Sequence, residues 1–339
     1  MDCKQHDLIR IILDRILMQE YTDKLPRAVD LAEEFQVNVK TVNKAILHLV
    51  NRGVLERKRR GGTYIVSMQK NNPEPVVEVL FDGFMSIFSH PFWHHIWEAM
   101  IRELDAGGFR AILTILKSDS QTGLLSFNHK NFYPLAEGRI ILGSYEKLFL
   151  NRVAETKVPF ITACDPLDPA IPQVSFDFTE GIHDAVKYLL QQGCRKIGFI
   201  GQTQSMIYPC LLNKFHAYLN SIQDYFQVDP ACIGNTRPVP GGGAAALRKI
   251  LECSSPDALI AAYDNQLPEI LQLLDKKKIK IPVIGCDGLD FPNIPPNRPV
   301  VRAPLRECGK LAAEKIIQAI RKHRMPKSTY LKAEFDPGK

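Results

Sequence analysis

A cluster of basic side chains in the first fifth of the chain has the composition of a surface that binds DNA. Between Asn38 and Gly62 the sequence carries seven Lys or Arg residues and one Glu, and this local excess of +6 equals the formal net charge of the whole chain. Lysine and arginine neutralise phosphates, whereas asparagine can read an adenine edge. For the run from Arg57 to Arg60 taken alone, an ordinary solvated surface explains the charge equally well. The predicted contacts to double-stranded DNA are Arg27, Asn38, Lys40, Thr41, Asn43, Lys44, Arg57, Lys58, Arg59, Arg60, Gly61 and Gly62.

A helix after Asn38 would position these cations. Asn38 is a suitable N-cap, and apolar residues then recur every three or four positions, as one buried stripe of a helix requires. The residues of this stripe are Val39, Val42, Ile46 and Leu49. At about 100° per residue, the opposite face centres on Lys40, Lys44 and Asn51. A shorter stripe from Ala28 to Phe35 predicts a preceding helix, and the connection between the two suits a helix-turn-helix.

A basic hairpin is predicted to follow the second helix. Gly53 suits the left-handed conformation in which helices commonly end. Short β-rich runs at 54–56 and 63–66 flank the segment from Arg57 to Gly62, and its paired glycines suit a tight turn. The expected hairpin carries four consecutive cations at its tip, where they could lie along phosphates or enter a minor groove.

The whole segment resembles the GntR family of bacterial regulators. The residues that carry the resemblance are Leu25-Pro26, Leu31-Ala32, Phe35-Gln36-Val37, Thr41-Val42, Ala45-Ile46, Leu49, Gly53 and Gly62-Thr63-Tyr64-Ile65-Val66. Family members commonly carry arginine where this chain has Val29, Val39 and Asn43, so the resemblance does not identify the DNA sequence. It implies a winged helix-turn-helix domain over residues 1–68. The segment that follows is polar, carries two prolines and lacks periodicity, which predicts a linker over 69–75.

Composition limits the class of protein. The 339 residues are 45% hydrophobic, which is typical of a folded chain with two or three packed units. The first apolar helix is interrupted by Arg10, Asp14 and Arg15, and no run reaches the roughly 18 apolar residues that cross a bilayer. The eight cysteines are scattered without a C-x-x-C pair, as in a reducing compartment. We therefore expect a cytoplasmic protein with no membrane partner.

The pattern changes beyond Lys70, where 30 Lys or Arg residues stand against 28 Asp or Glu residues. Short β-rich runs alternate with helical periods, which indicates an α/β fold with parallel sheets covered on both faces, and the number of units favours two sheets. The predicted strands are 76–81, 111–115, 139–142, 159–163, 196–201, 258–262 and 282–286. The predicted helices are 92–104, 145–156, 179–192, 210–222, 243–251 and 266–277.

Polar and aromatic side chains follow several of these strands, at the edge where open parallel sheets bind small molecules. Aromatic faces stack on rings, and carboxylates accept hydrogens from hydroxyls or amines. For each side chain taken singly, packing or helix capping is an equally good explanation. The candidate ligand-binding residues are Asp82, Phe84, Phe92, Trp93, Tyr145, Asp165, Asp177, Tyr208, Tyr263, Asp264 and Asp287.

This part of the chain resembles the periplasmic-binding-protein-like sensor of the LacI/GalR family. The resemblance is carried by residues 174–181, 189, 193–201, 256–265, 281–288, 304–309 and 312–313. It implies an effector-binding domain over 76–339, with lobes at about 76–174 with 302–326 and at 177–300 with 328–337. By the same resemblance, Asp287 and the pair Phe92-Trp93 line the cleft between the lobes.

Two departures from this family fall on the expected cleft. An arginine that the family commonly uses to grip ligand oxygens is Leu211 here, and Phe178 stands where a polar residue is common. The predicted cleft is therefore more apolar and aromatic than usual.

The residue patterns of zinc binding, phosphate binding and nucleophilic catalysis are all incomplete in this sequence. His90, His94 and His95 have a spacing that can chelate zinc, but no further spaced ligand completes the set, so no metal is expected. Gly241-Gly242-Gly243 precedes a helix and could cradle phosphate, yet without a P-loop lysine a flexible helix start is the better interpretation. No Ser-His-Asp or Cys-His set is recognisable from spacing. We expect neither an enzyme nor a bound cofactor.

Together the two resemblances imply a transcription regulator, most simply a repressor. Its affinity for DNA would change when a small-molecule effector, such as a sugar or a related metabolite, binds between the lobes. A homodimer is expected because paired heads read two half-sites. Two alternatives stay open: the body is a ligand-free module for dimerisation or for a protein partner, or it is an enzyme that acts on a metabolite.

Overall fold

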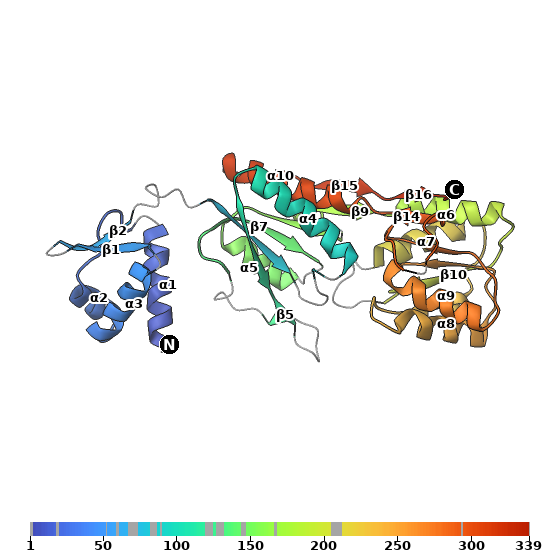
Figure 1. Cartoon of the computed structure of the whole chain (residues 1–339), viewed down its shortest axis with the longest axis horizontal. Coiled ribbons are helices and arrows are strands. Elements are labelled where there is room, and N and C mark those ends of the chain that lie inside the picture. Colours follow the sequence, from blue (N-terminus) through green and yellow to red (C-terminus); the bar gives the residue numbers. More distant parts are fainter. Residues whose placement is uncertain are drawn as a thin grey trace. The chain divides into compact units, whose positions relative to one another are not determined.

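The chain divides into two compact units, Met1–Pro75 and Val76–Lys339, which we call the head and the body. The computed structural model (Figure 1) describes residues 3–17, 20–51, 53–58, 61–66, 74–81, 87–88, 90–118, 125–126, 132–143, 147–165, 168–204, 212–292 and 294–338. No helix in these ranges is both long and apolar enough to cross a membrane.

The head packs three helices and a hairpin around one apolar core. The helices are α1 (Cys3–Leu17), α2 (Ala28–Glu34) and α3 (Val39–Asn51), and the strands are β1 (Leu55–Lys58) and β2 (Gly62–Ile65). The predicted stripe of α3 is buried at Val42, Ile46 and Leu49. Val39 departs from the prediction, because it is 37% exposed at the first residue of the helix, beyond the edge of the core.

Both predicted ends of α3 are confirmed. The Asn38 side-chain oxygen accepts the backbone N–H of Lys40 at 2.8 Å, as an N-cap does. Gly53 has a φ of 73°, the left-handed conformation expected after the helix. The chain can therefore turn directly from α3 into the hairpin.

The hairpin differs from its prediction in one respect. Strands β1 and β2 pair antiparallel from Leu55 opposite Ile65 to Lys58 opposite Gly62. Arg57 and Lys58 therefore belong to a strand rather than to the tip, because the pairing extends two residues further than the apolar pattern suggested. Arg59 and Arg60 lie outside the described residues.

The body contains two six-stranded sheets, each covered by helices on both faces. The first sheet is parallel throughout, in the order β15-β9-β8-β7-β3-β4. Its strands are β3 (Val76–Phe81), β4 (Arg110–Ile115), β7 (Ala136–Leu142), β8 (Phe160–Cys164), β9 (Gln173–Asp177) and β15 (Thr329–Lys332). A two-stranded ribbon of β5 (Lys117–Ser118) and β6 (Leu125–Ser126) accompanies it.

Three helices cover this sheet and complete the first lobe. Helices α4 (Pro91–Ala106) and α10 (Leu305–Arg321) lie side by side on one face, and α5 (Lys147–Glu155) packs on the other (Figure 1). The two paired helices approach so closely that a Cβ on Gly309 would lie 2.1 Å from the backbone oxygen of Ile96. Residues 305–321 are thereby packed into a lobe that begins more than two hundred positions earlier in the chain.

The second sheet has the order β11-β10-β12-β13-β14-β16, and only β16 is antiparallel to its neighbour. Its strands are β10 (Ile197–Gly201), β11 (Ile233–Asn235), β12 (Ala258–Ala261), β13 (Val283–Gly285), β14 (Val300–Arg302) and β16 (Glu334–Asp336). Helices α6 (Thr179–Gln191) and α7 (Asn213–Gln223) cover one face, and α8 (Gly242–Cys253) and α9 (Leu267–Lys276) cover the other. Short 3-10 turns occupy Pro230–Cys232 and Asp264–Gln266. This sheet and its helices form the second lobe.

The chain passes between the two sheets three times, after β9, after β14 and after β15. The expected division placed 328–337 entirely in the second lobe, whereas Thr329–Lys332 pairs with β9 of the first sheet and Glu334–Asp336 pairs with β14 of the second. Each half of this tail completes the edge of a different sheet. Such three- and four-residue edge strands carry too little periodicity to be found in the sequence.

Candidate functional site

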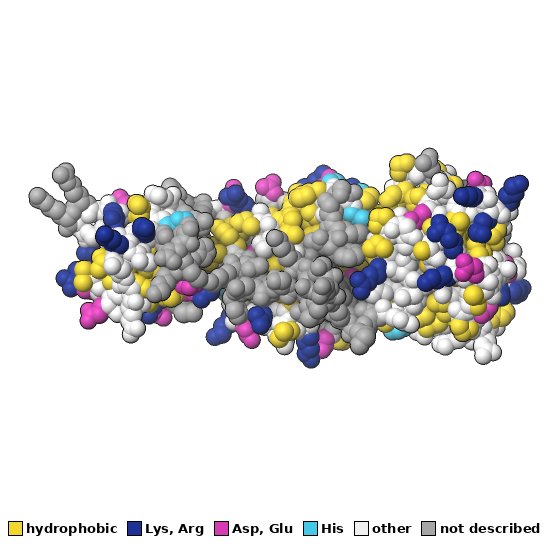
Figure 2. Space-filling model, turned by 90° about the horizontal axis from the view of Figure 1, so that it is seen from below, with side chains coloured by type: hydrophobic (Ala, Val, Ile, Leu, Met, Phe, Trp, Pro, Cys, Tyr) yellow, Lys and Arg dark blue, Asp and Glu magenta, His cyan; other side chains and the backbone are white. Residues whose placement is uncertain are grey.

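The outward face of α3 and the hairpin form one continuous polar surface. Lys40 and Lys44 are exposed on α3, as predicted, and Asn43 is half-buried between them. The Arg57 Nη2 atom, on β1, donates a hydrogen bond to the Asn43 Oδ1 atom at 2.5 Å. The Asn43 amide nitrogen donates to the Val39 carbonyl at 3.1 Å, which leaves a second amide hydrogen for another acceptor. Arg57 therefore holds the hairpin against the helix that would enter the major groove. Figure 2 shows Lys and Arg side chains on the surface of the head.

Tyr64 of the hairpin contacts two lysines, one from β1 and one from the segment before α2. The Lys58 Nζ atom lies 4.8 Å from the centre of the Tyr64 ring, and the Lys24 Nζ atom lies 5.4 Å from it. A cation over an aromatic face is attracted by the ring quadrupole but keeps its charge. Gly61 is half-buried and Gly62, opposite Lys58, is exposed.

Arg27, one of the predicted DNA contacts, forms an ion pair within the chain itself. Its guanidinium donates two hydrogen bonds of 3.0 Å to the Asp30 carboxylate. These bonds lower the pKa of Asp30 and raise the pKa of Arg27, so both groups stay charged and neutralise each other. Asn38 uses its side-chain oxygen for the N-cap, and Thr41 is half-buried. Among the described predicted residues, Lys40, Asn43, Lys44, Arg57 and Lys58 remain the surface best placed for DNA.

In the body, Asp287 follows β13 and is 5% exposed. Its Oδ1 atom lies 2.6 Å from the Lys214 Nζ atom, and its Oδ2 atom accepts the backbone N–H of Asp264 at 3.0 Å. Burial is the largest single influence and favours the neutral amine of Lys214, but the charge and hydrogen bond of Asp287, together with the nearby Cys286 and Asp165, raise the lysine pKa overall. Lys214 is the second residue of α7, and the sequence analysis did not identify it.

Asp264 lies in the interior of the second lobe. It is fully buried, and its Oδ2 atom accepts the Leu289 N–H at 2.7 Å and the Arg298 guanidinium at 3.1 Å. Burial is the main cause that raises the pKa of Asp264 to about 7, and the charge of Asp287 adds to it. Tyr263, which precedes Asp264 in the chain, is half-buried.

The predicted aromatic pair lies in the first lobe. Trp93 is 9% exposed and meets Phe81 edge to face, with ring centres 5.2 Å apart. Phe92 packs against Trp93 at 5.0 Å and against Phe176 at 6.3 Å, and it is half-buried. Asp165, after β8, is also half-buried. Asp82, Phe84, Tyr145, Tyr208 and Leu211 lie outside the described residues.

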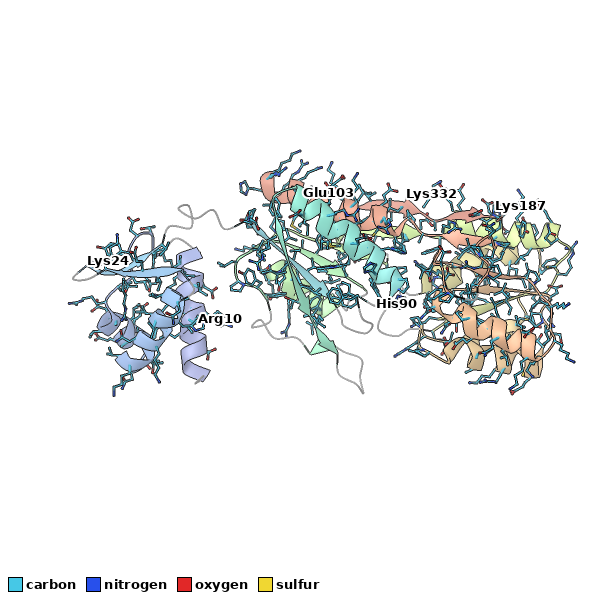
Figure 3. The ribbon with its side chains drawn as sticks, in the orientation of Figure 1. Arg10, Lys24, His90, Glu103, Lys187 and Lys332 are labelled. Atoms are coloured by element: carbon cyan, nitrogen blue, oxygen red, sulfur yellow. The ribbon has the colours of Figure 1, made fainter. Side chains whose placement is uncertain are left out.

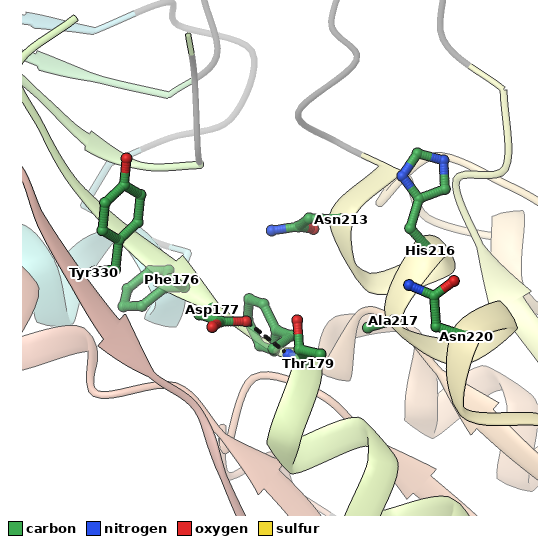
Figure 4. A pocket seen from close by; sticks show the side chains of 9 residues that line it. Phe176, Asp177, Thr179, Asn213, His216, Ala217, Asn220 and Tyr330 are labelled. Atoms are coloured by element: carbon green, nitrogen blue, oxygen red, sulfur yellow. Dashed lines mark hydrogen bonds between the residues drawn. The ribbon is translucent and has the colours of Figure 1, made fainter. Parts of the chain in front are cut away.

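A groove of about 280 Å³ opens beside the passage from β9 to α6 (Figure 4). Among the predicted ligand-binding residues that the structure describes, Asp177 alone lines this groove, and its carboxylate accepts the Thr179 N–H at 2.9 Å. Three polar residues of α7 that lie on this groove, Asn213, His216 and Asn220, were not predicted, although their spacing of three and four positions places them on one face of a helix. The described residues that line the groove are Phe176, Asp177, Phe178, Thr179, Asn213, His216, Ala217, Asn220 and Tyr330.

The structure also describes the glycine run considered as a phosphate site and the histidines considered as a zinc site. The backbone N–H groups of Gly241, Gly243 and Ala244 all donate to the Glu269 carboxylate, at 2.6, 2.6 and 3.2 Å. A carboxylate of the chain itself therefore occupies the position where a phosphate would bind. The His95 Nδ1 atom lies 3.2 Å from an Arg306 nitrogen, and no group of three or more His, Cys, Asp or Glu among the described residues could hold a metal.

Comparison with known proteins agrees with the two-part division. Residues 5–65 match the family model of bacterial regulatory proteins of the gntR family, and residues 186–338 match a periplasmic binding protein-like domain. The chain is 26% identical over 129 residues to the HTH-type transcriptional regulator MalR of Streptococcus pneumoniae, which is 38% of this chain and 39% of MalR. It is 23% identical over 185 residues to the HTH-type transcriptional repressor CytR of Escherichia coli, covering 52% of this chain and 54% of CytR.

The chain thus spans 39% and 54% of the length of these two relatives. A solved complex of the transcriptional regulator CelR with cellobiose has a TM-score of 0.66 and 19% identity, over 89% of this chain and 92% of that one. At this identity the likeness shows the fold alone. The relatives and the solved structure named above are transcription regulators rather than enzymes, and this chain is similar to them through a head that matches the gntR family model and a body that matches a periplasmic binding protein-like domain.

Proposed function

We propose that this protein is a transcription regulator that binds double-stranded operator DNA through its head and a small-molecule effector through its body. The bond between Arg57 and Asn43 carries the first half of the proposal, because it joins the hairpin and α3 into one cationic surface. Lys40 and Lys44 flank Asn43 on that surface, where they can reach phosphates or guanine. The match to the GntR family supports the same assignment.

The body supplies the control in this proposal. Two α/β lobes joined by three crossovers can change their relative arrangement, and a ligand that prefers one arrangement shifts the population toward it. In a homodimer this shift would change the spacing of two heads and so the affinity for paired half-sites. The resemblance and the CelR complex with cellobiose support a sugar or a related metabolite as effector. The same resemblance supports repression, and the protein would act in the cytoplasm.

The DNA half is tested by selecting duplexes from a random library with the purified full-length protein. We expect the enriched duplexes to share one sequence, and footprinting to show two protected half-sites. Lys40→Ala and Lys44→Ala should weaken binding to that duplex at least tenfold, whereas Lys196→Ala in the body should leave it unchanged. A library that yields no common sequence would overturn the proposal for the head.

The effector half is tested by thermal shift with sugars, nucleosides and related metabolites. A compound that binds only the folded body raises its melting temperature, and the same compound should then change the affinity for the selected duplex. One observation favours a ligand-free body instead, because both oxygens of Asp287 already accept hydrogen bonds from the chain itself. A complete panel without any shift would support that alternative.

A further inference from the structure

The Lys214 ammonium group sits in a site made of a carboxylate, a carbonyl and two aromatic faces. Its Nζ atom lies 2.6 Å from Asp287 Oδ1 and 2.7 Å from the Ala262 carbonyl oxygen. The same atom lies 4.4 Å from the centre of the Phe178 ring and 5.4 Å from that of the Tyr263 ring. A carboxylate with aromatic walls is the arrangement by which proteins bind ammonium groups of small molecules. Here the ammonium belongs to the chain itself.

This ion pair differs from the surface ion pairs of the same lobe. The side chains of Lys214 and Asp287 are 10% and 7% exposed, whereas those of Lys196 and Asp229 are 44% and 38% exposed. Asp287 also accepts the backbone N–H of Asp264 on its second oxygen. A ligand hydroxyl would therefore meet a buried carboxylate whose two oxygens are already engaged.

Groups of the first lobe face this pair. Asp165, after β8, is among the charges that raise the pKa of Lys214. Burial lowers the pKa of His90, and the charge of Asp287 acts in the opposite direction. His90 lies at the start of α4 (Figure 3), and both of its ring nitrogens are buried without a hydrogen-bond partner among the described residues. Phe178, whose ring centre lies 4.4 Å from the Lys214 Nζ atom, joins β9 of the first sheet to α6 of the second lobe, so the pair lies beside a passage of the chain between the lobes.

We propose that Lys214 is an internal ligand that fills the Asp287 subsite of the effector cleft, and that this subsite takes a primary ammonium group rather than a sugar hydroxyl. The inference rests on the proposed function, because it takes Asp287 as part of the effector cleft. With Lys214 in place the subsite is closed to molecules from solution. The effector of the native protein then binds without using Asp287, and Lys214 determines which ligands the body rejects.

Replacing Lys214 by alanine should open the subsite. Lys214→Ala removes three methylene groups and the ammonium, which together have the size and charge of n-propylammonium. We expect n-propylammonium chloride to raise the melting temperature of this variant by about 3 to 6 °C at ten times its Kd. 1-Propanol, which has the same length but no charge, should produce no shift, and neither compound should stabilise the native protein.

Two further variants serve as controls. Lys196→Ala removes a lysine from an exposed ion pair of the same lobe, and n-propylammonium should not stabilise it. Lys214→Ala combined with Asp287→Asn keeps the cavity but removes the carboxylate, and the stabilisation should disappear. An equal shift in either control would show that the amine acts non-specifically, and this result would overturn the proposal.

Affinity for the selected duplex separates an internal ligand from a purely structural ion pair. If Lys214 acts as a ligand, Lys214→Ala changes this affinity at least fivefold, and n-propylammonium restores the native value. Stabilisation by the amine without any change in DNA affinity would mean that the pair only stabilises the lobe, and would refute the proposal. If Lys214→Ala fails to fold, its folding is followed by circular dichroism. The proposal then requires that n-propylammonium, and not 1-propanol, restores the signal of the folded protein. If the native protein selects no DNA, the proposed function fails, while the thermal shifts still decide the ammonium subsite.

Discussion

The sharpest prediction concerns the salt dependence of DNA binding by the head. Lys40, Lys44 and Lys58 are exposed, and none of them makes an ion pair with another described residue. Arg27 is exposed too, but the Asp30 carboxylate already neutralises it through two hydrogen bonds. Replacing the three lysines by alanine therefore removes three charges that are free to displace counterions from DNA. Arg27→Ala removes a charge that is already paired with Asp30 and does not displace counterions.

The magnitude follows from counterion release. The logarithm of the binding constant falls with the logarithm of salt concentration by about 0.9 for each phosphate that a protein neutralises. One phosphate for each lysine predicts that the triple variant has a slope smaller by about 2.7. A fourfold rise in salt weakens binding by about 3.5-fold for each such contact, so the three lysines account for about 40-fold of the native salt effect. Arg27→Ala should leave the slope within experimental error of the native one.

The assay is fluorescence anisotropy with a labelled duplex between about 50 and 200 mM salt, the range over which phosphate contacts produce large changes. Both the selected duplex and an unrelated duplex are measured, because loss of phosphate contacts should weaken binding to each by a similar factor. An unchanged slope in the triple variant, or an equal change in Arg27→Ala, would refute the assignment of this surface.

Three further predictions concern stability. Glu78→Gln leaves the buried Arg139, 2.9 Å away, without its counter-charge and should lower the free energy of unfolding by about 3 to 5 kcal/mol in urea denaturation. The double variant E78M/R139M should lose less, and an equal loss would contradict this reasoning. Because the pKa of Asp264 is raised to about 7, folded Asp264 keeps a proton that the unfolded chain releases above 3.8. The free energy of unfolding of the native protein should therefore fall by up to about 1.4 kcal/mol per pH unit between about pH 4 and pH 7. Asp264→Asn should lack this contribution. If the free energies of the native protein and the variant changed in parallel with pH, a raised pKa of Asp264 would be excluded. Asn38→Ala removes the oxygen that caps α3 and should cost about 1 kcal/mol, seen as faster hydrogen exchange of the first amides of α3, including that of Lys40.

Much of the fold could be predicted because its signals are local. The stripe of α3 and the apolar run of Val76–Phe81 are buried in the structure, since side-chain periodicity directly reflects which face of an element meets the core. Short edge strands such as β15 and β16 were missed because three or four residues form no usable period. Val39 was expected to be buried, yet it is exposed, because a periodic pattern does not show where the neighbouring core ends.

The candidate sites were predicted less completely. Their residue types came from the sequence, and the basic surface of the head is formed largely by the side chains expected there. The hydrogen-bond partners of these residues could not be predicted from the sequence. Arg57 and Asn43, for example, are 14 positions apart and meet only when the hairpin folds back on α3. Likewise Glu269 is 28 positions from Gly241, whose N–H group it accepts. The glycine run alone favoured a flexible helix start, and the sequence did not show that Glu269 would bind its N–H groups.

The sequence by itself determined that a basic winged head precedes an α/β body, because periodicity, caps and charge runs depend on neighbours in the chain. Only the tertiary structure decided which charged side chains form ion pairs within the chain and which remain available to other molecules. Asp287 had the position of a ligand-binding carboxylate, but Lys214, 73 positions earlier, lies against it once the lobe is assembled. The energy of an ion pair depends on distance and burial, and both are set by how distant segments pack.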